Sequence, residues 1–534
     1  MAKYLVITGG VLSGLGKGVI TASTGLLLKS LSYSVTAIKI DPYVNVDAGT
    51  MNPYIHGEVF VTDDGGETDL DIGHYERFLN ASLSKKNNIT TGQIFMRVIE
   101  KERMGAYLGQ CVQIIPHITD EVKNRINEVA RETGVDIVLV EIGGTVGDIE
   151  GLPFLEAVRQ LRMEEGADNV AFIHVALAPI LSTTGELKTK PVQHSVQELR
   201  RIGIQPDAVI VRSIAWLDNE ARRKIALYSN LPPLAVFSVP DLDTIYRVPL
   251  VLNEQGFTKY IAERMKLKYI DLDLEEWCNY TKRLISANRE ASIAMVGKYT
   301  KLHDSYISII EALNHSGALI GVKPKLKWIE ATEIEEGVIK PEVILESNGV
   351  IVLPGFGRRG AEGKIKAIEI ARENKKPLLG ICFGFQLMVV EYARNVIGLS
   401  KANSTEVDPH TPHPVVDLLP EQRAVSRLGG TMRLGLHPIK ITAGTLAYEI
   451  YGKEIVYERH RHRYEVNAKY IDLLESGGLT ISGWSIDGFP EIVELKDSSF
   501  YLGIQAHPEF RSRPLNPSPI YVKFLERAAL STRQ

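Results

Sequence analysis

The sequence predicts an α/β protein made of two doubly wound domains, and three observations carry this prediction. Short β-rich runs alternate with helix-length segments in both halves of the chain, which is the pattern of parallel sheets with crossover helices. A glycine-rich turn follows the first predicted strand, and a glycine-flanked cysteine follows a strand in the second half. Both turns are typical of the point where a parallel strand gives way to a helix.

The predicted strands are placed by their β-branched and apolar composition. A polar helical stretch at 271–290 separates two alternating series, so we expect a first domain at 1–270, a linker at 271–290 and a second domain at 291–534. The strands of the first series are expected at 4–8, 35–40, 136–141, 171–177, 208–212 and 235–238. Those of the second are expected at 292–296, 350–353, 378–381, 480–484, 491–495 and 501–505.

Composition narrows the class of partner. The 534 residues include 61 basic and 65 acidic side chains, a net charge of −4, without the basic excess of proteins that hold nucleic acid. No run approaches the roughly 20 apolar residues of a membrane span. Three cysteines do not make a disulfide framework, and a reactive thiol is most easily kept reduced in the cytosol. We therefore expect a cytoplasmic protein with neither a nucleic-acid nor a membrane partner.

A candidate phosphate-binding loop lies between the first strand and the helix after it. Its glycines free backbone amides for phosphate oxygens, the helix N-terminus adds positive potential, and Lys17 adds a charge. Gly18 stands where serine or threonine usually binds Mg²⁺, so the metal ligands must come from elsewhere. The candidates are the run Asp69, Leu70, Asp71 after a glycine-rich turn and Glu141 at the end of a strand; the alternatives are an ordinary glycine-rich turn and solvated charges at the two acidic sites.

A candidate nucleophile lies at the glycine-flanked turn of the second half. The spacing around Cys382 suits a sharp strand-to-helix turn, and we expect its thiol to be exposed at the sheet edge. His507 and Glu509 supply a base and an orienting carboxylate two residues apart. A small buried apolar cysteine is the structural alternative, but the downstream histidine favours catalysis.

Two further sets of side chains invite a binding interpretation. Lys188 and Lys190 lie in a proline-limited loop and Lys39 ends a strand, so these lysines are suited to a second triphosphate; an exposed basic loop is the alternative. A strand at the histidine run places His460 and His462 on one face without an obvious further ligand, so no zinc site is expected there.

Several longer sequence runs are more specific than either glycine-rich turn. The first half carries KIDPY at 39–43, HGEVFV at 56–61, ETDLD at 67–71, GHYERF at 73–78, EIGGTVGDIE at 141–150 and KTKP at 188–191. The second half carries NSTE at 403–406 and ERHRHRYEV at 458–466. Over nearly the whole chain, these runs resemble those of the CTP synthases. The resemblance implies a phosphate-loop-type amidoligase domain followed by a class I glutamine amidotransferase domain.

The activity that this resemblance implies is ATP-dependent amination of UTP to CTP. The 4-oxygen of UTP is phosphorylated, and ammonia released from L-glutamine displaces the phosphate. The resemblance implies Mg²⁺ at Asp71 and Glu141, and CTP as a feedback inhibitor. The implied nucleotide-binding residues are Ser13, Gly14, Leu15, Gly16, Lys17, Gly18, Lys39, Asp71, Asp148, Ile149, Glu150, Lys188, Thr189, Lys190, Pro191, Val192, Gln193, Lys224 and Asp241.

The family resemblance also implies roles in the second domain. Cys382 forms a thioester with glutamine, His507 moves protons and Glu509 orients His507, with the oxyanion held by backbone amides near Gly355, Phe356 and Phe383. The implied glutamine-binding residues are Gly355, Phe383, Gly384, Phe385, Gln386, Glu406 and Arg463. The loop at 353–357 is one glycine shorter than the family pattern, and Gly14 replaces a second serine.

Regulation and assembly follow from the resemblance alone. It implies activation by GTP, although Ile307 occupies the position of a lysine implicated in that activation, and it implies a homotetramer. One alternative is another glutamine amidotransferase of the phosphate-loop class that amidates a carboxylate, such as a corrinoid side chain. The other is a nucleotide-sensing or filament-forming protein without catalysis, against which the intact set of candidate catalytic residues argues.

Overall fold

The computed structural model describes residues 2–52, 56–298, 300–419, 422 and 430–531. These residues form two compact units, each with its own sheet. The first unit consists of Met1–Ala48 and Thr68–Thr281, and the second of Gly49–Glu67 and Lys282–Gln534. The predicted α/β class with two wound domains is confirmed.

The first unit is built on a seven-stranded parallel sheet with the order β5-β2-β6-β1-β7-β8-β9. Its strands are almost wholly buried, as expected where helices cover both faces. Because the strands are parallel, the carboxyl ends of neighbouring strands open on the same edge. The strands are β1 (Lys3–Gly10), β2 (Val35–Asp41), β5 (Asn88–Thr90), β6 (Ile137–Ile142), β7 (Val170–Leu177), β8 (Ala208–Ser213) and β9 (Val236–Pro240).

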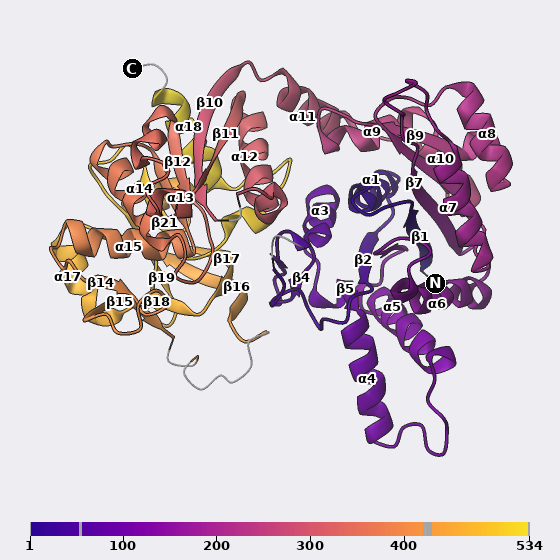
Figure 1. Cartoon of the computed structure of the whole chain (residues 1–534), viewed down its shortest axis with the longest axis horizontal. Helices are drawn as coiled ribbons and strands as arrows, with labels where there is room; N and C mark the ends of the chain where they lie inside the picture. Colours follow the sequence, from indigo (N-terminus) through magenta and orange to yellow (C-terminus); the bar gives the residue numbers. More distant parts are fainter. Residues whose placement is uncertain (1, 53–55, 299, 420–421, 423–429, 532–534) are drawn as a thin grey trace. The chain divides into compact units, whose positions relative to one another are not determined.

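Helices lie on both faces of this sheet (Figure 1). One face packs against α1 (Lys17–Ser30), which contacts α3 (Leu70–Leu79) and α9 (Val248–Glu254). The other face forms a hydrophobic core with α4 (Thr91–Arg103), α5 (Thr119–Thr133), α6 (Leu152–Glu165) and α7 (Lys190–Arg201). The remaining helices are α8 (Asn219–Ser229), α10 (Phe257–Arg264) and α11 (Glu275–Ser286).

The second unit contains a nine-stranded mixed sheet with the order β11-β10-β12-β13-β21-β20-β19-β16-β17. The first five strands in this order, from β11 to β21, pair in parallel. From β21 onward, each strand pairs with the next in antiparallel orientation. The strands are β10 (Arg289–Gly297), β11 (Val322–Glu330), β12 (Gly349–Val352), β13 (Leu378–Ile381), β16 (Arg433–Ile441), β17 (Ile455–His462), β19 (Thr480–Ser485), β20 (Pro490–Glu494) and β21 (Tyr501–Ile504).

Two hydrophobic cores sandwich the nine-stranded sheet. One includes α13 (Ala331–Glu335), α14 (Ala361–Glu373) and α15 (Phe383–Asn395); the other includes α12 (Ile307–Ile320), α16 (Leu446–Tyr451) and α18 (Pro519–Leu530). The smaller elements are α17 (Ile471–Ser476), the three-stranded sheet of β14 (Ala402–Ser404), β15 (His413–Leu418) and β18 (Tyr464–Val466), and the pair β3 (Phe60–Val61) and β4 (Glu67–Thr68).

Every strand predicted from the sequence overlaps a strand of the structure, and 378–381 coincides with β13. Among the strands of the two large sheets, the prediction missed β5, β11 and β16. β11 lies at the edge of its sheet, and its sequence VKPKLKWIE alternates lysine with other residues, as edge strands do to discourage further pairing. Composition rules that reward continuous apolar runs overlook such a strand.

The segment Gly49–Glu67 differs from the expected domain organisation. It falls inside the expected first domain at 1–270 but packs with the second unit. Arg459 on β17 is fully buried and donates from Nε to Asp63 at 2.6 Å and from Nη1 to the Val61 carbonyl at 3.0 Å. Phe60 packs edge-on against Phe510, with ring centroids 5.1 Å apart. These contacts fasten an early segment of the chain to the second unit.

We expect Asp63→Ala to destabilise the second unit by about 1–3 kcal/mol, because it leaves a buried guanidinium short of an acceptor. The measurement is the free energy of unfolding from denaturant titration. The exposed Asp497→Ala is the control and should change stability by less than about 0.5 kcal/mol. Equal effects of both substitutions would show that the contact between Arg459 and Asp63 does not hold the segment.

Candidate active sites

A strained turn presents the cysteine at the end of β13. Cys382 has φ 53° and ψ −106°, in a region that residues with side chains rarely adopt, and α15 begins at the next residue. The turn is possible because Gly384 lacks a side chain: a Cβ there would lie 2.2 Å from the Val352 carbonyl oxygen. The predicted strand-to-helix turn is therefore present, with a physical reason for its glycine.

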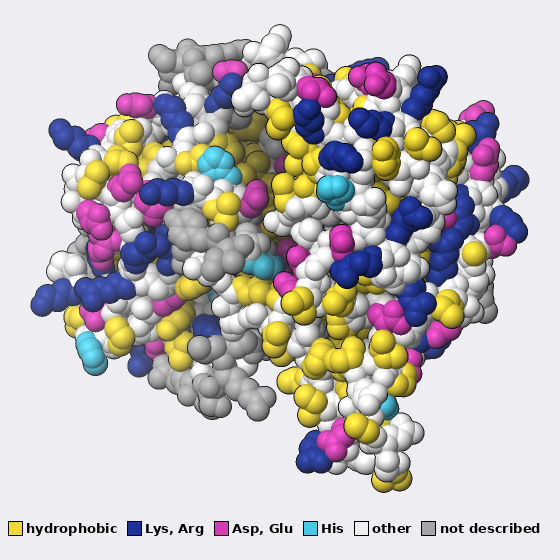
Figure 2. All heavy atoms as spheres, turned by 45° about the vertical axis from the view of Figure 1, so that its right-hand side comes forward, with side chains coloured by type: hydrophobic (Ala, Val, Ile, Leu, Met, Phe, Trp, Pro, Cys, Tyr) yellow, Lys and Arg dark blue, Asp and Glu magenta, His cyan; other side chains and the backbone are white. Residues whose placement is uncertain are grey.

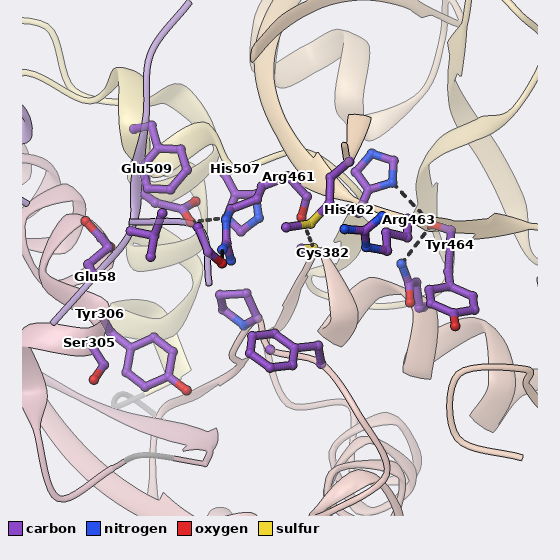
Figure 3. Close-up of a pocket in the computed structure, with 18 of the residues that line it drawn as sticks. Glu58, Ser305, Tyr306, Cys382, Arg461, His462, Arg463, Tyr464, His507 and Glu509 are labelled. Atoms are coloured by element: carbon purple, nitrogen blue, oxygen red, sulfur yellow. Dashed lines mark hydrogen bonds and ion pairs between the residues drawn. The ribbon is translucent and has the colours of Figure 1, made fainter. Parts of the chain in front are cut away.

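Cys382, His507 and Glu509 come together around one cavity (Figure 3). His507 Nδ1 lies 2.7 Å from Glu509 Oε1, and the Tyr521 hydroxyl donates to the other carboxylate oxygen at 3.1 Å. Burial by itself lowers the pKa of His507, but Glu509 and Cys382 outweigh it and raise that pKa to about 10. The arrangement favours an imidazolium next to the sulfur, with Glu509 fixing the ring.

The thiol is not exposed at the sheet edge, contrary to the expectation from the sequence. Cys382 is only 4% exposed, and its Sγ lies 3.6 Å from the Arg461 carbonyl oxygen and 3.7 Å from Gln505 Nε2. Arg461 lies on β17, and Gln505 directly follows β21. The nucleophile is therefore buried in the wall of a cavity of about 480 Å³.

The predicted glutamine-binding residues fall into two groups. Gly355, Gln386, Glu406 and Arg463 line the cavity, whereas Phe383, Gly384 and Phe385 form the first turn of α15 beneath it. Burial raises the pKa of Glu406, whose carboxylate accepts from the Gly357 N–H at 2.6 Å. An acidic and a basic side chain thus face one cavity.

Several cavity residues were not predicted. Met51, Glu58 and Val59 come from the segment Gly49–Glu67, and Tyr306 and Phe510 come from the second half. Arg461 is held by Glu67, with Nε 2.9 Å from Oε1. The motif HGEVFV at 56–61 was a signal of function, but nothing in its pattern indicated that it would reach the cysteine.

The glycine-rich loop of the first unit follows β1 and leads into α1, as predicted. Gly16 has φ 80°, and the residues from Val11 to Gly14 are exposed, which leaves their amides accessible at the helix N-terminus. Lys17 is buried against Gly9 and donates from Nζ to the Gly144 carbonyl at 2.7 Å.

The missing hydroxyl of this loop has a structural reason. A Cβ on Gly18 would lie 1.8 Å from Asp71 Oδ1, so the carboxylate of Asp71 occupies the space that a serine or threonine side chain would need. Asp71 begins the first turn of α3. It brings a carboxylate to the position from which the hydroxyl is absent.

Lys39 lies among four carboxylates at the ends of β2 and β6. Its Nζ contacts Asp71, lies 2.7 Å from Asp69 and 3.6 Å from Glu141, and is 3.5 Å from Asp41. Although burial lowers it, the four carboxylates hold the pKa of Lys39 well above its usual value. Burial, followed by the charge of Asp71, raises the pKa of Glu141 to about 7. Lys17 is a second cation near these carboxylates; burial lowers its pKa, and their charge acts in the opposite direction. Asp71 and Glu141 offer carboxylate oxygens, the donors that a hard divalent cation prefers.

The predicted triphosphate-binding segment lies at the start of α7. Lys188 pairs with Glu186 at 2.6 Å, Lys190 lies over the ring of Tyr228, and Gln193 is buried and donates to Thr189 Oγ1 at 3.0 Å. The remaining predicted residues lie in the same unit. Asp148, Ile149 and Glu150 follow β6, and Pro191 and Val192 lie in the first turn of α7, where Val192 is fully buried. Lys224 is exposed on α8, and Asp241 follows β9 and pairs with Arg212 at 2.9 Å.

The histidines of β17 lie on one face, as the strand pattern indicated. His460 Nδ1 and His462 Nε2 are 3.0 Å apart, and burial drives the pKa of both rings well below the usual value. Over the described residues, no cluster of three or more His, Cys, Asp and Glu has a metal-binding arrangement. The same residues include no helix with the length and hydropathy of a membrane span.

Comparison with known proteins agrees with this architecture. Residues 3–267 match the family model of the CTP synthase N-terminus, and residues 301–527 match that of glutamine amidotransferase class-I. The molecule is therefore of the class that joins a nucleotide-binding ligase unit to a class I glutaminase unit.

Whole-length relatives define the family within that class. A CTP synthase of Aeropyrum pernix is 62% identical over 530 residues, covering 99% of this chain and 98% of the relative. A CTP synthase of Saccharolobus solfataricus is 59% identical, covering 99% of both chains, and one of Pyrococcus furiosus is 57% identical, covering 100% of this chain and 99% of the relative. The chain belongs to the CTP synthase family, and its reaction is the glutamine-dependent conversion of UTP to CTP.

We expect Glu509→Gln to lower the glutamine-dependent rate by about 10²- to 10⁴-fold, because a neutral amide neither fixes the ring tautomer nor stabilises the imidazolium. Loss of the carboxylate also lowers the pKa of His507 from about 10, so the charged ring is lost at lower pH. The alkaline limb of the pH–rate profile for glutamine hydrolysis should therefore move to lower pH.

The control is the exposed Glu454→Gln, which should keep both the rate and the profile. An unchanged alkaline limb in Glu509→Gln would remove His507 from this ionisation.

Proposed function

We propose that the CTP synthase reaction is divided between the units, with ammonia released at Cys382 and consumed at a nucleotide site around Lys17. The observation that carries this division is that each unit holds a complete set of groups for its half of the chemistry. The triad and its cavity lie in the second unit, whereas the glycine-rich loop, the lysines and the carboxylates lie in the first.

In the glutaminase half, the Cys382 thiolate attacks the amide carbon of glutamine, and His507 gives a proton to the departing ammonia. Water then cleaves the thioester, with His507 as the base and Glu509 holding Nδ1. Backbone amides near Gly355, Phe356 and Phe383 stabilise the oxyanion. Glu406 and Arg463 bind the ammonium and carboxylate of glutamine, which their position in the cavity wall supports.

In the synthase half, phosphoryl transfer from ATP to UTP depends on positioned positive charge. The amides of Gly14, Leu15, Gly16 and Gly18 bind the phosphates of ATP, with Lys17 and Lys39 near the transferred group. Mg²⁺ held by Asp71 and Glu141 would neutralise phosphate charge. The segment from Lys188 to Gln193 binds UTP or the inhibitor CTP, together with Ser13, 148–150 and Lys224, and Asp241 is a further nucleotide-binding residue.

Assembly as a homotetramer is supported by an exposed apolar surface on α4 and on the segment that follows it, between Met96 and Ile115. Large hydrophobic side chains are exposed along this stretch, and Figure 2 shows them as a yellow surface low on the molecule. Monomers rarely expose so contiguous an apolar surface, and a second copy of the chain is the occupant that we propose. The residues are Met96, Ile99, Met104, Leu108, Ile114 and Ile115. We also propose that GTP activates the enzyme and that the protein is cytoplasmic.

The test of the whole function is CTP formation from UTP, ATP and Mg²⁺ with either glutamine or ammonium as the nitrogen donor. Cys382→Ala should abolish synthesis from glutamine and keep synthesis from ammonium, because ammonia bypasses the thioester. The exposed Cys111→Ala is the control and should keep both rates. If Cys382→Ala lost CTP synthesis from ammonium as fully as from glutamine, the division of the reaction between two sites would be contradicted.

Lys17→Met should lower CTP formation from both donors by about 10³-fold or more, because the phosphoryl group loses one of its two neighbouring lysine charges. Glutamine hydrolysis should persist, since that chemistry lies in the other unit. Lys259→Met, on the exposed side of α10, serves as the matched control. Substantial ammonium-driven synthesis by Lys17→Met would remove Lys17 from phosphoryl transfer.

A further inference from the structure

Lys364 is a buried lysine beneath the glutaminase cavity that the reaction scheme does not use. It lies on α14 and is 1% exposed, and its Nζ donates to the Leu353 carbonyl at 2.7 Å and lies 3.4 Å from the Pro354 carbonyl oxygen. These carbonyls begin the loop that carries Gly355 into the cavity wall. An ammonium in the interior is costly unless backbone acceptors or charges compensate it.

The same loop is held farther along from two sides. Lys298 Nζ donates to the Phe356 carbonyl, and the Gly357 N–H donates to Glu406 Oε1 at 2.6 Å. The carbonyl and N–H of a trans peptide point in opposite directions, so these contacts fix the plane of the Phe356–Gly357 peptide. By the same geometry, drawing the Pro354 carbonyl toward Lys364 turns the Gly355 N–H away from Lys364.

Lys364 also contacts the second segment that supplies an oxyanion amide. Its Nζ lies 5.1 Å from the centre of the Phe383 ring, within the range of a cation–π contact. Phe383 follows the nucleophile directly. One ammonium therefore touches both the loop at 353–357 and the turn after Cys382.

The charge environment of Lys364 is mixed. Burial and, to a lesser extent, Lys298 lower the pKa of Lys364, whereas Cys382, Glu330 and Glu406 raise it, and together they leave it at about 7. A negative charge that develops near the sulfur during the reaction favours the protonated form.

We propose that Lys364 is a positioning residue for glutamine hydrolysis, which holds the loop at 353–357 and the turn at Phe383 at the spacing that their amides need to stabilise the oxyanion. It acts through the backbone and does not touch glutamine. This role also accounts for a loop one glycine shorter than the family pattern, because a short loop with two lysine anchors has little freedom to turn its amides away. The inference rests on the glutaminase activity of the proposed function.

The test is Lys364→Met, which keeps the length of the side chain and removes the charge and the donors. We expect kcat for glutamine hydrolysis to fall by about 10- to 100-fold with little change in KM, since the groups that bind ground-state glutamine remain. CTP formation from ammonium should keep its rate. Lys366→Met, an exposed position on the same helix, is the control and should keep all three values.

A second readout separates positioning from simple core packing. The probe is the γ-semialdehyde of glutamate, whose aldehyde carbon is attacked by the Cys382 thiolate. A C–S bond forms, the C=O π bond breaks, and the resulting tetrahedral oxyanion lies where the backbone amides would stabilise it until it is protonated. Its inhibition constant should rise in Lys364→Met by the same factor as kcat falls. Lys364→Gln retains N–H donors for the Leu353 carbonyl, so it should recover part of kcat and part of the affinity for the semialdehyde. If the Met variant does not fold, Lys364→Gln serves as the test variant.

The outcomes are distinguishable. An unchanged kcat in a folded Lys364→Met, or a lower kcat with an unchanged inhibition constant for the semialdehyde, overturns the positioning role. A rise in KM that accounts for the whole loss assigns Lys364 to substrate binding instead and also overturns it. Absence of glutamine hydrolysis in the unaltered protein contradicts the proposed function itself and not this inference.

Discussion

The glutaminase unit depends on one close approach, between the backbone at Gly384 and the carbonyl of Val352. A side chain at Gly384 would lie 2.2 Å from that oxygen, so only glycine lets α15 start immediately after β13. The same compression holds Cys382 at a positive φ, a strained conformation that the packing of two buried strands maintains. The position of the sulfur is therefore set by the core and not by the cavity.

Charge compensation plays the corresponding part in the synthase unit. Four carboxylates surround Lys39 beside the glycine-rich loop, and burial raises the pKa of two of them, Asp41 to about 8 and Glu141 to about 7. Asp71 also explains why the loop lacks a hydroxyl at Gly18, since the carboxylate already fills that space.

The segment Gly49–Glu67 packs with the second unit, although most of that unit lies more than 200 residues later in the sequence. Its acidic residues pair with the arginines of β17, whose neighbouring histidines face the opposite side of the strand. The alternation of β17 thus separates two tasks, with arginines fastening the segment and histidines packing near the cavity. Glu58 extends the same attachment by accepting from the Ser308 N–H at 3.1 Å, at the start of α12.

The sequence by itself determined the two wound sheets, the glycine-rich loop and the strand-to-helix turn at Cys382, because these depend on local periodicity and on glycines at fixed spacing. It also indicated His507 and Glu509, since they are two residues apart. Only the tertiary structure decided that Gly49–Glu67 joins the second unit, that the thiol is buried, and that Lys364 and Lys298 anchor the loop at 353–357. Those features arise from contacts between residues far apart in the chain, whose partners are set by packing and burial, and no local pattern records them.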